Sequence, residues 1–236
     1  MITFFMFPRT VKSFVRRQRR LSGRQQDAFD RAWPLYGVAP ESLCDFQKLF
    51  QREAPVVCEI GFGDGDTLLP MAVMHPEWNY VGIEIHEPGV ANLFSSMLAQ
   101  DIRNIRVIIE DAVTVFEKNI PDHSLSRIHI FFPDPWPKKK HRKRRLISDN
   151  VAALLVKKLK PGGVIHSATD WEDYAMQMMR VLSANPQLKN ACGEDQFADN
   201  QVMRLRDTSK FEKRGVKLGH GVWDLVFIRS LLVASM

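Results

Sequence analysis

The chain has few cysteines, and none of them are spaced as metal ligands: Cys44, Cys58 and Cys192. An odd number without such spacing argues against a disulfide framework and against zinc, so we expect no metal site. Cys58 stands inside an apolar run and is expected to be a small buried residue. Cysteine used in this way is typical of the reducing cytoplasm, where we expect this protein to act.

Long apolar runs are also missing. No stretch reaches the roughly 18 apolar residues that a membrane span requires, so we expect no membrane partner. Residues 1–7 are apolar but too few for the core of a signal peptide, and positive charges follow them instead of preceding them. Residues 1–26 lack acids altogether and contain seven Lys or Arg. A mitochondrial transit peptide has a similar composition, and the sequence leaves that alternative open.

Positive charge is distributed unevenly along the chain. The net charge is +6 and the isoelectric point about 9.3, yet seven further Lys or Arg lie within residues 138–145. Two such groups in an otherwise balanced chain indicate an extended anionic partner such as RNA. A length of 236 residues fits one large domain. We therefore divide the chain into a basic N-terminal arm, 1–26, and a single domain, 27–236.

Short apolar runs alternate with helical patterns from Pro55 onward. Strands are expected at 56–60, 80–85, 105–109, 126–132, 164–168 and 221–228. Helices are expected at 68–74, 88–103, 146–159 and 171–183. Residues 27–53 are predicted to form short helical pieces broken at Pro34 and Pro40. Successive βα units predict an α/β fold with a mostly parallel sheet and helices on both faces.

A glycine-rich turn follows the first of these strands, with glycines at Gly61, Gly63 and Gly65. Such a turn lets a ligand approach the backbone closely, although a purely structural turn is the alternative. Three acids surround it: Glu59, Asp64 and Asp66. Carboxylates repel the pyrophosphate of a dinucleotide but attract the sulfonium and ammonium groups of S-adenosylmethionine. The predicted cofactor is therefore S-adenosylmethionine.

Acids stand at the ends of successive predicted strands or soon after them: Glu59, Glu84, Asp111, Asp134 and Asp170. Ligands of open α/β sheets bind at the carboxyl ends of the strands, so we expect these side chains to converge there. Glu84 stands where an acid commonly binds a ribose diol. Asp111 could accept a hydrogen bond from the adenine amino group, or it could be the N-cap of a helix.

The segment 131–137 holds one carboxylate and one large aromatic between three prolines. Proline fixes φ and restricts the preceding residue, so Asp134 and Trp136 are expected on a stiff loop. The cations of 138–145 follow at once, at a density that suits a phosphate backbone. This combination indicates chemistry on a nucleic-acid base, the alternative being a surface turn before a solvated helix. Trp136 could stack on a base or pack in the core.

Five segments together resemble the bacterial tRNA (guanine-N7)-methyltransferases: EIGFG at 59–63, GIEIH at 82–86, FPDPWPKKKH at 132–141, TDW at 169–171 and SKFEKRG at 209–215. The resemblance extends over essentially the whole chain. It implies a class I, Rossmann-like fold with a mostly parallel seven-stranded sheet whose last strand is antiparallel. It also implies in-line transfer of a methyl group from S-adenosylmethionine to N7 of a guanine in the variable loop of tRNA.

The same resemblance implies roles for particular residues. The implied cofactor-binding residues are Glu59, Gly61, Gly63, Glu84, Asp111 and Asp134. Asp134 is also the implied catalytic residue. The implied substrate-binding residues are Lys138, Asp170, Ser209, Lys210, Phe211 and Glu212. Ser209 stands where Thr is expected, and it keeps the hydroxyl.

Three alternatives follow from the residues themselves. A dinucleotide oxidoreductase would need a glycine loop that accepts phosphate, and a non-catalytic RNA-binding module would leave the acids at the strand ends unexplained. A methyltransferase for a different RNA fits the residues equally well, because only the resemblance names the nucleotide. We expect tRNA as the partner, no required protein partner, and a monomer or a homodimer.

Overall fold

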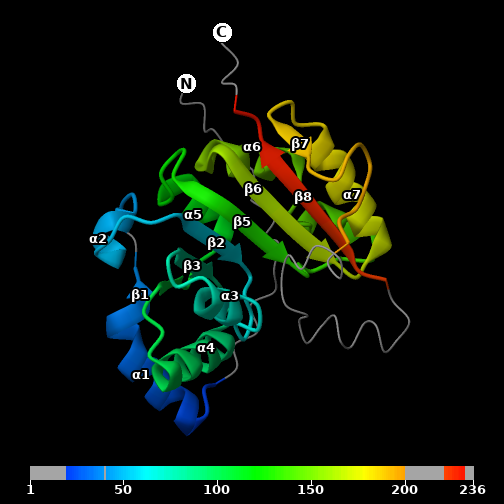
Figure 1. Ribbon diagram of the computed structural model, residues 1–236. Coiled ribbons are helices and arrows are strands. Elements are labelled where there is room, and N and C mark those ends of the chain that lie inside the picture. Colours follow the sequence, from blue (N-terminus) through cyan, green and yellow to red (C-terminus); the bar gives the residue numbers. More distant parts are fainter. Residues whose placement is uncertain (1–19, 40, 200–220, 232–236) are drawn as a thin grey trace, which may run out of the picture.

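The computed structural model describes residues 20–39, 41–199 and 221–231. A single twisted sheet crosses the molecule, with helices on both of its faces (Figure 1). Its strand order is β1-β4-β3-β2-β5-β6-β8-β7. The strands are β1 Gly37–Val38, β2 Val56–Ile60, β3 Asn79–Ile83, β4 Ile105–Ile108, β5 Leu125–Phe131, β6 Leu159–Thr169, β7 Leu188–Asn190 and β8 Trp223–Arg229.

The predicted fold class is confirmed. The strands from β1 to β6 in this order pair in parallel, and β8 runs antiparallel to both β6 and β7. β1, a strand of two residues, adds an eighth strand to the seven expected. It falls in the segment 27–53, for which only helical pieces were predicted, and it forms the edge of the sheet by pairing with β4.

Helices divide between the two faces of the sheet. They are α1 Gly23–Tyr36, α2 Phe46–Phe50, α3 Leu68–Met74, α4 Glu87–Gln100, α5 Ala112–Lys118, α6 Asp149–Lys158 and α7 Glu172–Ser183, with a 3-10 helix η1 at Lys139–Arg144. α1, α3 and α4 share one buried apolar cluster with Val57 of β2, and α5, α6 and α7 share another with Cys58. Adjacent residues of β2 therefore point to opposite cores, which is why this strand is apolar along most of its length.

Most predicted bounds lie within three residues of the observed ones, and two differences are larger. α1 continues through Pro34 to Tyr36, because Pro34 lies in the last turn and the helix ends at Gly37, whose N–H donates to the carbonyl of Trp33. β6 begins at Leu159, directly after α6, so it starts five residues before the predicted strand 164–168. The register between β5 and β6 shifts there, from the pair Leu125 and Leu159 to the pair Arg127 and Val164.

The first turn of α1 belongs to the segment assigned to the basic arm. Ser22 and Gln25 form a capping box, in which the Gln25 N–H donates to the Ser22 hydroxyl and the Ser22 N–H to the Gln25 side chain. The side chain of Gln25 also donates to Asn92 on α4, over 3.1 Å. Residues 23–26 are therefore helical and fixed to the domain, whereas residues 1–19 lie outside the described part.

The register places the carboxyl ends of four parallel strands in one row. Ile60 of β2 pairs with Ile83 of β3 and with Ile130 of β5, and Ile83 pairs with Ile108 of β4. The loops that follow these strands leave the sheet at the same edge, which contains the predicted acids. Among the residues that the structure describes, no helix is long and apolar enough to cross a membrane.

Candidate active site

The glycine loop after β2 has a backbone that only glycine adopts easily. Gly61, Gly63 and Gly65 have φ values of +74°, +57° and +84°. A Cβ added at Gly61 or Gly63 would meet nothing within 4 Å, whereas one at Gly65 would meet the side chain of Leu93. The loop therefore presents an open backbone surface at Gly61 and Gly63, where a ligand could approach.

Glu59 lies directly beneath this loop. It is 1% exposed, and its carboxylate accepts a hydrogen bond from the hydroxyl of Thr67. Thr67 occupies the N-cap position of α3 but makes no side-chain capping hydrogen bond there. The role of Thr67 was not predicted from the sequence, although a hydroxyl residue at the end of a glycine loop is a signal for it. A buried carboxylate held in this way creates a site for a cation.

Glu84 holds the glycine loop to the start of α4. One carboxylate oxygen accepts from the Gly63 N–H over 2.9 Å. The other accepts from the N–H groups of Ile85 and His86, over 2.7 and 2.9 Å. Glu84 is thus bound to three backbone donors on two loops, a contact between loops that the sequence did not reveal. Its predicted contact with a ribose stays a prediction.

Gly89, in the first turn of α4, packs against the same loop. A Cβ added to Gly89 would overlap the carbonyl of Gly63. The close approach requires glycine at this position, and the prediction from sequence missed it. Nothing near Gly89 in the sequence distinguishes it from an ordinary helix glycine, because the contact depends on how α4 packs against the loop.

We expect the substitution Gly89→Ala to weaken S-adenosylmethionine binding by about tenfold or more, because either α4 or the glycine loop must shift to relieve the overlap. Isothermal calorimetry measures the affinity. Gly23→Ala is the matched control, since a Cβ at Gly23 meets nothing within 4 Å. Unchanged affinity in the Gly89→Ala variant would show that the loop does not bind the cofactor.

Asp111 is the N-cap of α5. Its carboxylate accepts from the N–H of Thr114 over 3.0 Å and from the Thr114 hydroxyl over 3.2 Å. One carboxylate oxygen of Asp111 therefore caps the helix, as the alternative prediction stated. A contact with adenine stays a prediction for the same side chain.

The proline loop between β5 and η1 has an unusual backbone. Phe132 and Trp136 have φ values of +51° and +42°, a region that bulky side chains rarely occupy. The Phe132 N–H donates to the carbonyl of Ala168 at the end of β6, over 2.8 Å. Asp134 lies between them and its side chain is exposed. A strained backbone of this kind is typical of functional sites.

Trp136 lies at the surface and is half-buried, so the alternative that placed it in the core is wrong. Its ring stacks on His141, with centroids 5.9 Å apart, and the guanidinium of Arg144 lies 4.9 Å from its centroid. Partial burial, followed by the charges of Lys140 and Arg144, lowers the pKa of His141. His141 serves as a stacking partner of Trp136, and base stacking by Trp136 stays a prediction.

The cationic run does not act as one unit. Four of its members are exposed lysines: Lys138, Lys139, Lys140 and Lys143. Arg142 and Arg145 instead turn toward Asp173 on α7, with ion pairs of 3.0 and 2.6 Å. Arg145 was expected to contact phosphate, and this expectation is wrong because its side chain is buried in the protein.

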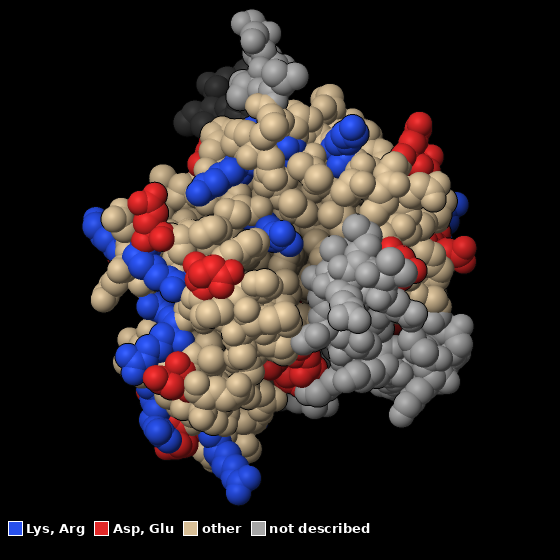
Figure 2. Space-filling model, in the orientation of Figure 1, with Lys and Arg blue, Asp and Glu red and all other residues tan. Residues whose placement is uncertain are grey.

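Asp170 leaves the sheet beside the proline loop. It follows β6, whose Ala168 pairs with Phe131 of β5, so Asp134 and Asp170 belong to neighbouring loops of one edge. The structure thus brings all five predicted acids to the carboxyl edge of the sheet. Figure 2 shows acidic side chains below the centre of the molecule, on the side to which β2 and β5 point in Figure 1. Ser209, Lys210, Phe211 and Glu212 lie outside the described residues.

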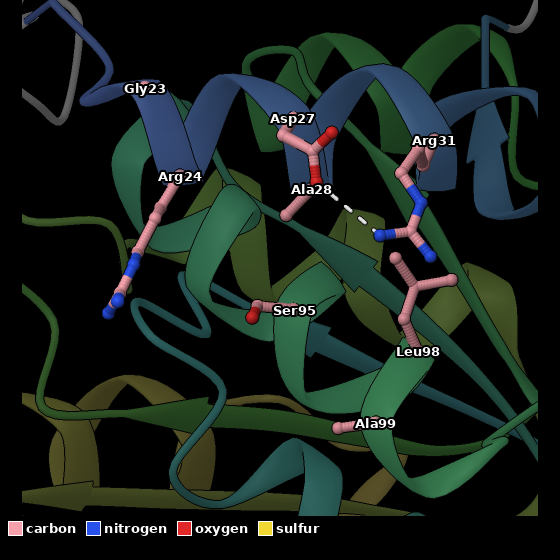
Figure 3. Close-up of a pocket in the computed structure, with 8 residues that line it drawn as sticks. All are labelled: Gly23, Arg24, Asp27, Ala28, Arg31, Ser95, Leu98 and Ala99. Carbon is pink, nitrogen blue, oxygen red and sulfur yellow. Dashed lines mark hydrogen bonds and ion pairs between the residues drawn. The ribbon is translucent and has the colours of Figure 1, made fainter.

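A separate hollow of about 530 Å³ lies between α1 and α4. Its polar lining includes Arg24, Asp27, Arg31 and Ser95 (Figure 3). Arg31 pairs with Asp27 over 3.4 Å on the exposed surface of α1. None of the predicted site residues line this hollow, so it is distinct from the acidic edge of the sheet.

The family follows from the similarity of this sequence to those of known proteins. A family model described as "Putative methyltransferase" matches residues 53–225. A tRNA (guanine-N(7)-)-methyltransferase of Hydrogenovibrio crunogenus is 51% identical, over 94% of this chain and 92% of the relative. The chain belongs to the tRNA (guanine-N7)-methyltransferase family.

Other relatives agree with this membership. A tRNA (guanine-N(7)-)-methyltransferase of Methylococcus capsulatus is 46% identical, over 94% of this chain and 96% of the relative. The crystal structure of the 16S rRNA methyltransferase KamB has a TM-score of 0.59 and 16% identity, covering 83% of this chain and 98% of that one. The latter likeness concerns the fold alone. The expectation of an S-adenosylmethionine-dependent methyltransferase is confirmed by the family.

Proposed function

We propose that this protein transfers a methyl group from S-adenosylmethionine to N7 of a guanine in the variable loop of tRNA. One arrangement supports the proposal above all. A buried carboxylate under an open glycine loop lies at the same sheet edge as the Pro-held Asp134 and a row of exposed lysines. A site for a cationic cofactor thus adjoins a surface suited to a polyanion.

The residues of the glycine loop fit the proposed cofactor. Glu59 supplies buried negative charge, and the open backbone at Gly61 and Gly63 leaves room for a ligand. Asp64 and Asp66 add further carboxylates around the loop. When bound, S-adenosylmethionine supplies an electrophilic methyl group on a positively charged sulfur. Glu59, Gly61, Gly63, Glu84 and Asp111 are the residues that would hold it.

Asp134 is proposed to position the guanine. N7 has a free in-plane lone pair and no proton to lose, so the reaction needs no general base. A carboxylate can accept hydrogen bonds from the N–H groups on the edge of guanine and so orient N7 toward the methyl group. Its negative charge also offsets the positive charge that the base gains. The prolines on both sides of Asp134 limit the conformational freedom that this arrangement must overcome.

The exposed lysines and the basic arm are proposed to bind the tRNA backbone. Lys138, Lys139, Lys140 and Lys143 lie beside the Asp134 loop, where they can contact phosphates around the target nucleotide. Phosphate contacts position an RNA without reading its sequence, so specificity has to come from the pocket around Asp134. Asp170 and the segment 209–212 are the further substrate contacts proposed.

Cellular location and partners complete the proposal. Cys44, Cys58 and Cys192 are free thiols, and burial raises the pKa of the Cys58 thiol, which suits an inert residue in a reducing compartment. We place the reaction in the cytoplasm, with tRNA as the partner and no protein subunit required.

The direct test incubates the protein with unmodified tRNA and S-adenosylmethionine carrying a labelled methyl group. Nuclease digestion and mass spectrometry then identify the modified nucleotide. The proposal predicts 7-methylguanosine in the variable loop. A label at another position, or in a different RNA only, would favour a methyltransferase with another substrate.

We expect Glu84→Gln to weaken S-adenosylmethionine binding by about 10- to 100-fold. Both oxygens of Glu84 accept from backbone N–H groups. In the glutamine variant the side-chain NH₂ must therefore face one of these N–H groups, whichever way the amide is turned. The loop at Gly63 then loses its attachment to α4. Calorimetry gives the affinity, and Glu87→Gln, an exposed acid three residues later, is the control. If both variants lowered the affinity for S-adenosylmethionine by the same small factor, Glu84 would not belong to the cofactor site.

A further inference from the structure

One arginine of the cationic run is buried, and its contacts join two loops of the site. The side chain of Arg145 is 1% exposed. Its Nε donates to the carbonyl of Pro135 over 2.8 Å, and its Nη1 donates to the Gln177 side chain over 2.8 Å. Its Nη2 pairs with the Asp173 carboxylate over 2.6 Å, and Nη1 also donates to the Asp173 carbonyl over 3.5 Å.

These partners lie on two different elements. Pro135 follows Asp134 directly in the proline loop, whereas Asp173 and Gln177 are one turn apart on α7. Tyr174 of the same helix lies under the guanidinium, 4.8 Å from its ring centroid. The planar guanidinium therefore spans the proline loop and α7, with its three nitrogens directed at fixed angles.

The attachment matters because of where α7 begins. The helix starts at Glu172, two residues after Asp170. Arg145 thus fixes the loop of the proposed catalytic Asp134 relative to the segment of the proposed substrate contact Asp170. Arg142 strengthens the same anchor, since it pairs with the other oxygen of Asp173 over 3.0 Å.

The backbone on both sides of Asp134 also needs an anchor. Phe132 and Trp136 occupy the left-handed region, which is unfavourable for such residues and persists only where surrounding contacts maintain it. The Pro135 carbonyl, held by Arg145, lies between Asp134 and Trp136. The hydrogen bond from Arg145 therefore acts on the most strained part of the loop.

We infer that Arg145 is a positioning residue for methyl transfer: it holds the Asp134 carboxylate at the guanine site and takes no part in binding phosphate. The inference rests on the proposed role of Asp134. It assigns two functions to adjacent cations, since the exposed lysines contact RNA while Arg145 fixes the loop that they flank.

The test replaces Arg145 by Lys, which keeps the charge but concentrates its donors at one nitrogen. A single ammonium cannot reach both the Pro135 carbonyl and the acceptors on α7 in the same geometry. We expect kcat to fall by about 10- to 100-fold, because a displacement of about 1 Å at a reacting group has an effect of this order. The affinity for S-adenosylmethionine, the affinity for tRNA and the salt dependence of tRNA binding should stay within about twofold.

Two further variants separate positioning from a general loss of stability. Asn79→Ala removes a buried amide oxygen that accepts from Arg52 over 2.7 Å, at the amino end of β3 and so at the opposite edge of the sheet from the proline loop. Asp173→Asn, at a partly exposed position, weakens the anchor without emptying a buried site. We expect Asp173→Asn to lower kcat in the same direction as Arg145→Lys, and Asn79→Ala to lower the melting temperature with kcat retained.

Calorimetric titration with S-adenosylmethionine counts the folded sites, so that kcat is expressed per competent enzyme. A kcat per site within twofold of wild type in Arg145→Lys would overturn the inference. A loss of tRNA affinity equal to the loss in kcat would also overturn it, by returning Arg145 to the phosphate contacts. Absence of tRNA methylation by the wild-type protein would instead contradict the proposed function itself.

Discussion

Replacing Asp134 by Asn lowers the rate of methyl transfer by about 10²- to 10³-fold, the usual effect of removing one preorganised electrostatic group from an active site. The amide keeps the size of the side chain but loses its charge and directs an NH₂ toward the N–H donors of guanine. The affinity for tRNA changes by less than about threefold, because phosphate contacts dominate binding. Single-turnover rates and equilibrium binding on the same tRNA measure the two effects separately.

Asp149→Asn is the matched control for this substitution. Asp149 is an acid in the first turn of α6, is 72% exposed and lies 4.0 Å from Arg180. It loses the same charge outside the site and should retain the wild-type rate. Losses of rate and of affinity that are equal in Asp134→Asn would contradict its role as a positioning and stabilising group.

The affinity for tRNA falls by about a thousandfold between roughly 50 and 200 mM salt, if several lysines and the basic arm neutralise phosphates. Each neutralised phosphate releases counterions, so the slope of log affinity against log salt counts the contacts. Replacing Lys139 or Lys140 by Gln reduces this slope by about one unit and lowers the affinity for all tRNAs by a similar factor. Fluorescence or filter binding over a salt series gives the slope.

Arg103→Gln provides the comparison. Arg103 is an exposed cation paired with Asp101 over 2.9 Å, and it precedes β4 at the amino edge of the sheet, away from the acids. It loses one charge far from the proposed RNA surface, so the slope should not change. A salt-independent affinity, or equal slopes in all variants, would show that tRNA is not held by these phosphate contacts.

Much of the sheet and of its acidic edge was predictable because the signal is local. β2 is apolar except for Glu59 and is followed by Gly61, and the acids stand at or soon after the ends of successive strands, so their meeting at one edge follows from parallel pairing alone. The helix α3 was predicted with its observed bounds, because Pro76 lies just beyond its end.

Contacts between distant segments were not predictable. Nothing near Arg145 in the sequence distinguishes it from its cationic neighbours, and its burial depends on α7, which begins 27 residues later at Glu172. The hydrogen bond from Gly63 to Glu84 and the approach of Gly89 to the same loop likewise depend on how α4 packs. The two residues of β1 were too few for a periodic signal.

The location of the cofactor tests the central claim most directly. A crystal structure of the protein with bound S-adenosylhomocysteine, the product of the cofactor, would locate it. We predict that the ligand lies on the backbone of Gly61 and Gly63, with its sulfur between Glu59 and the Asp134 loop and its ribose near Glu84. A ligand bound elsewhere, for example in the hollow between α1 and α4, would contradict the account.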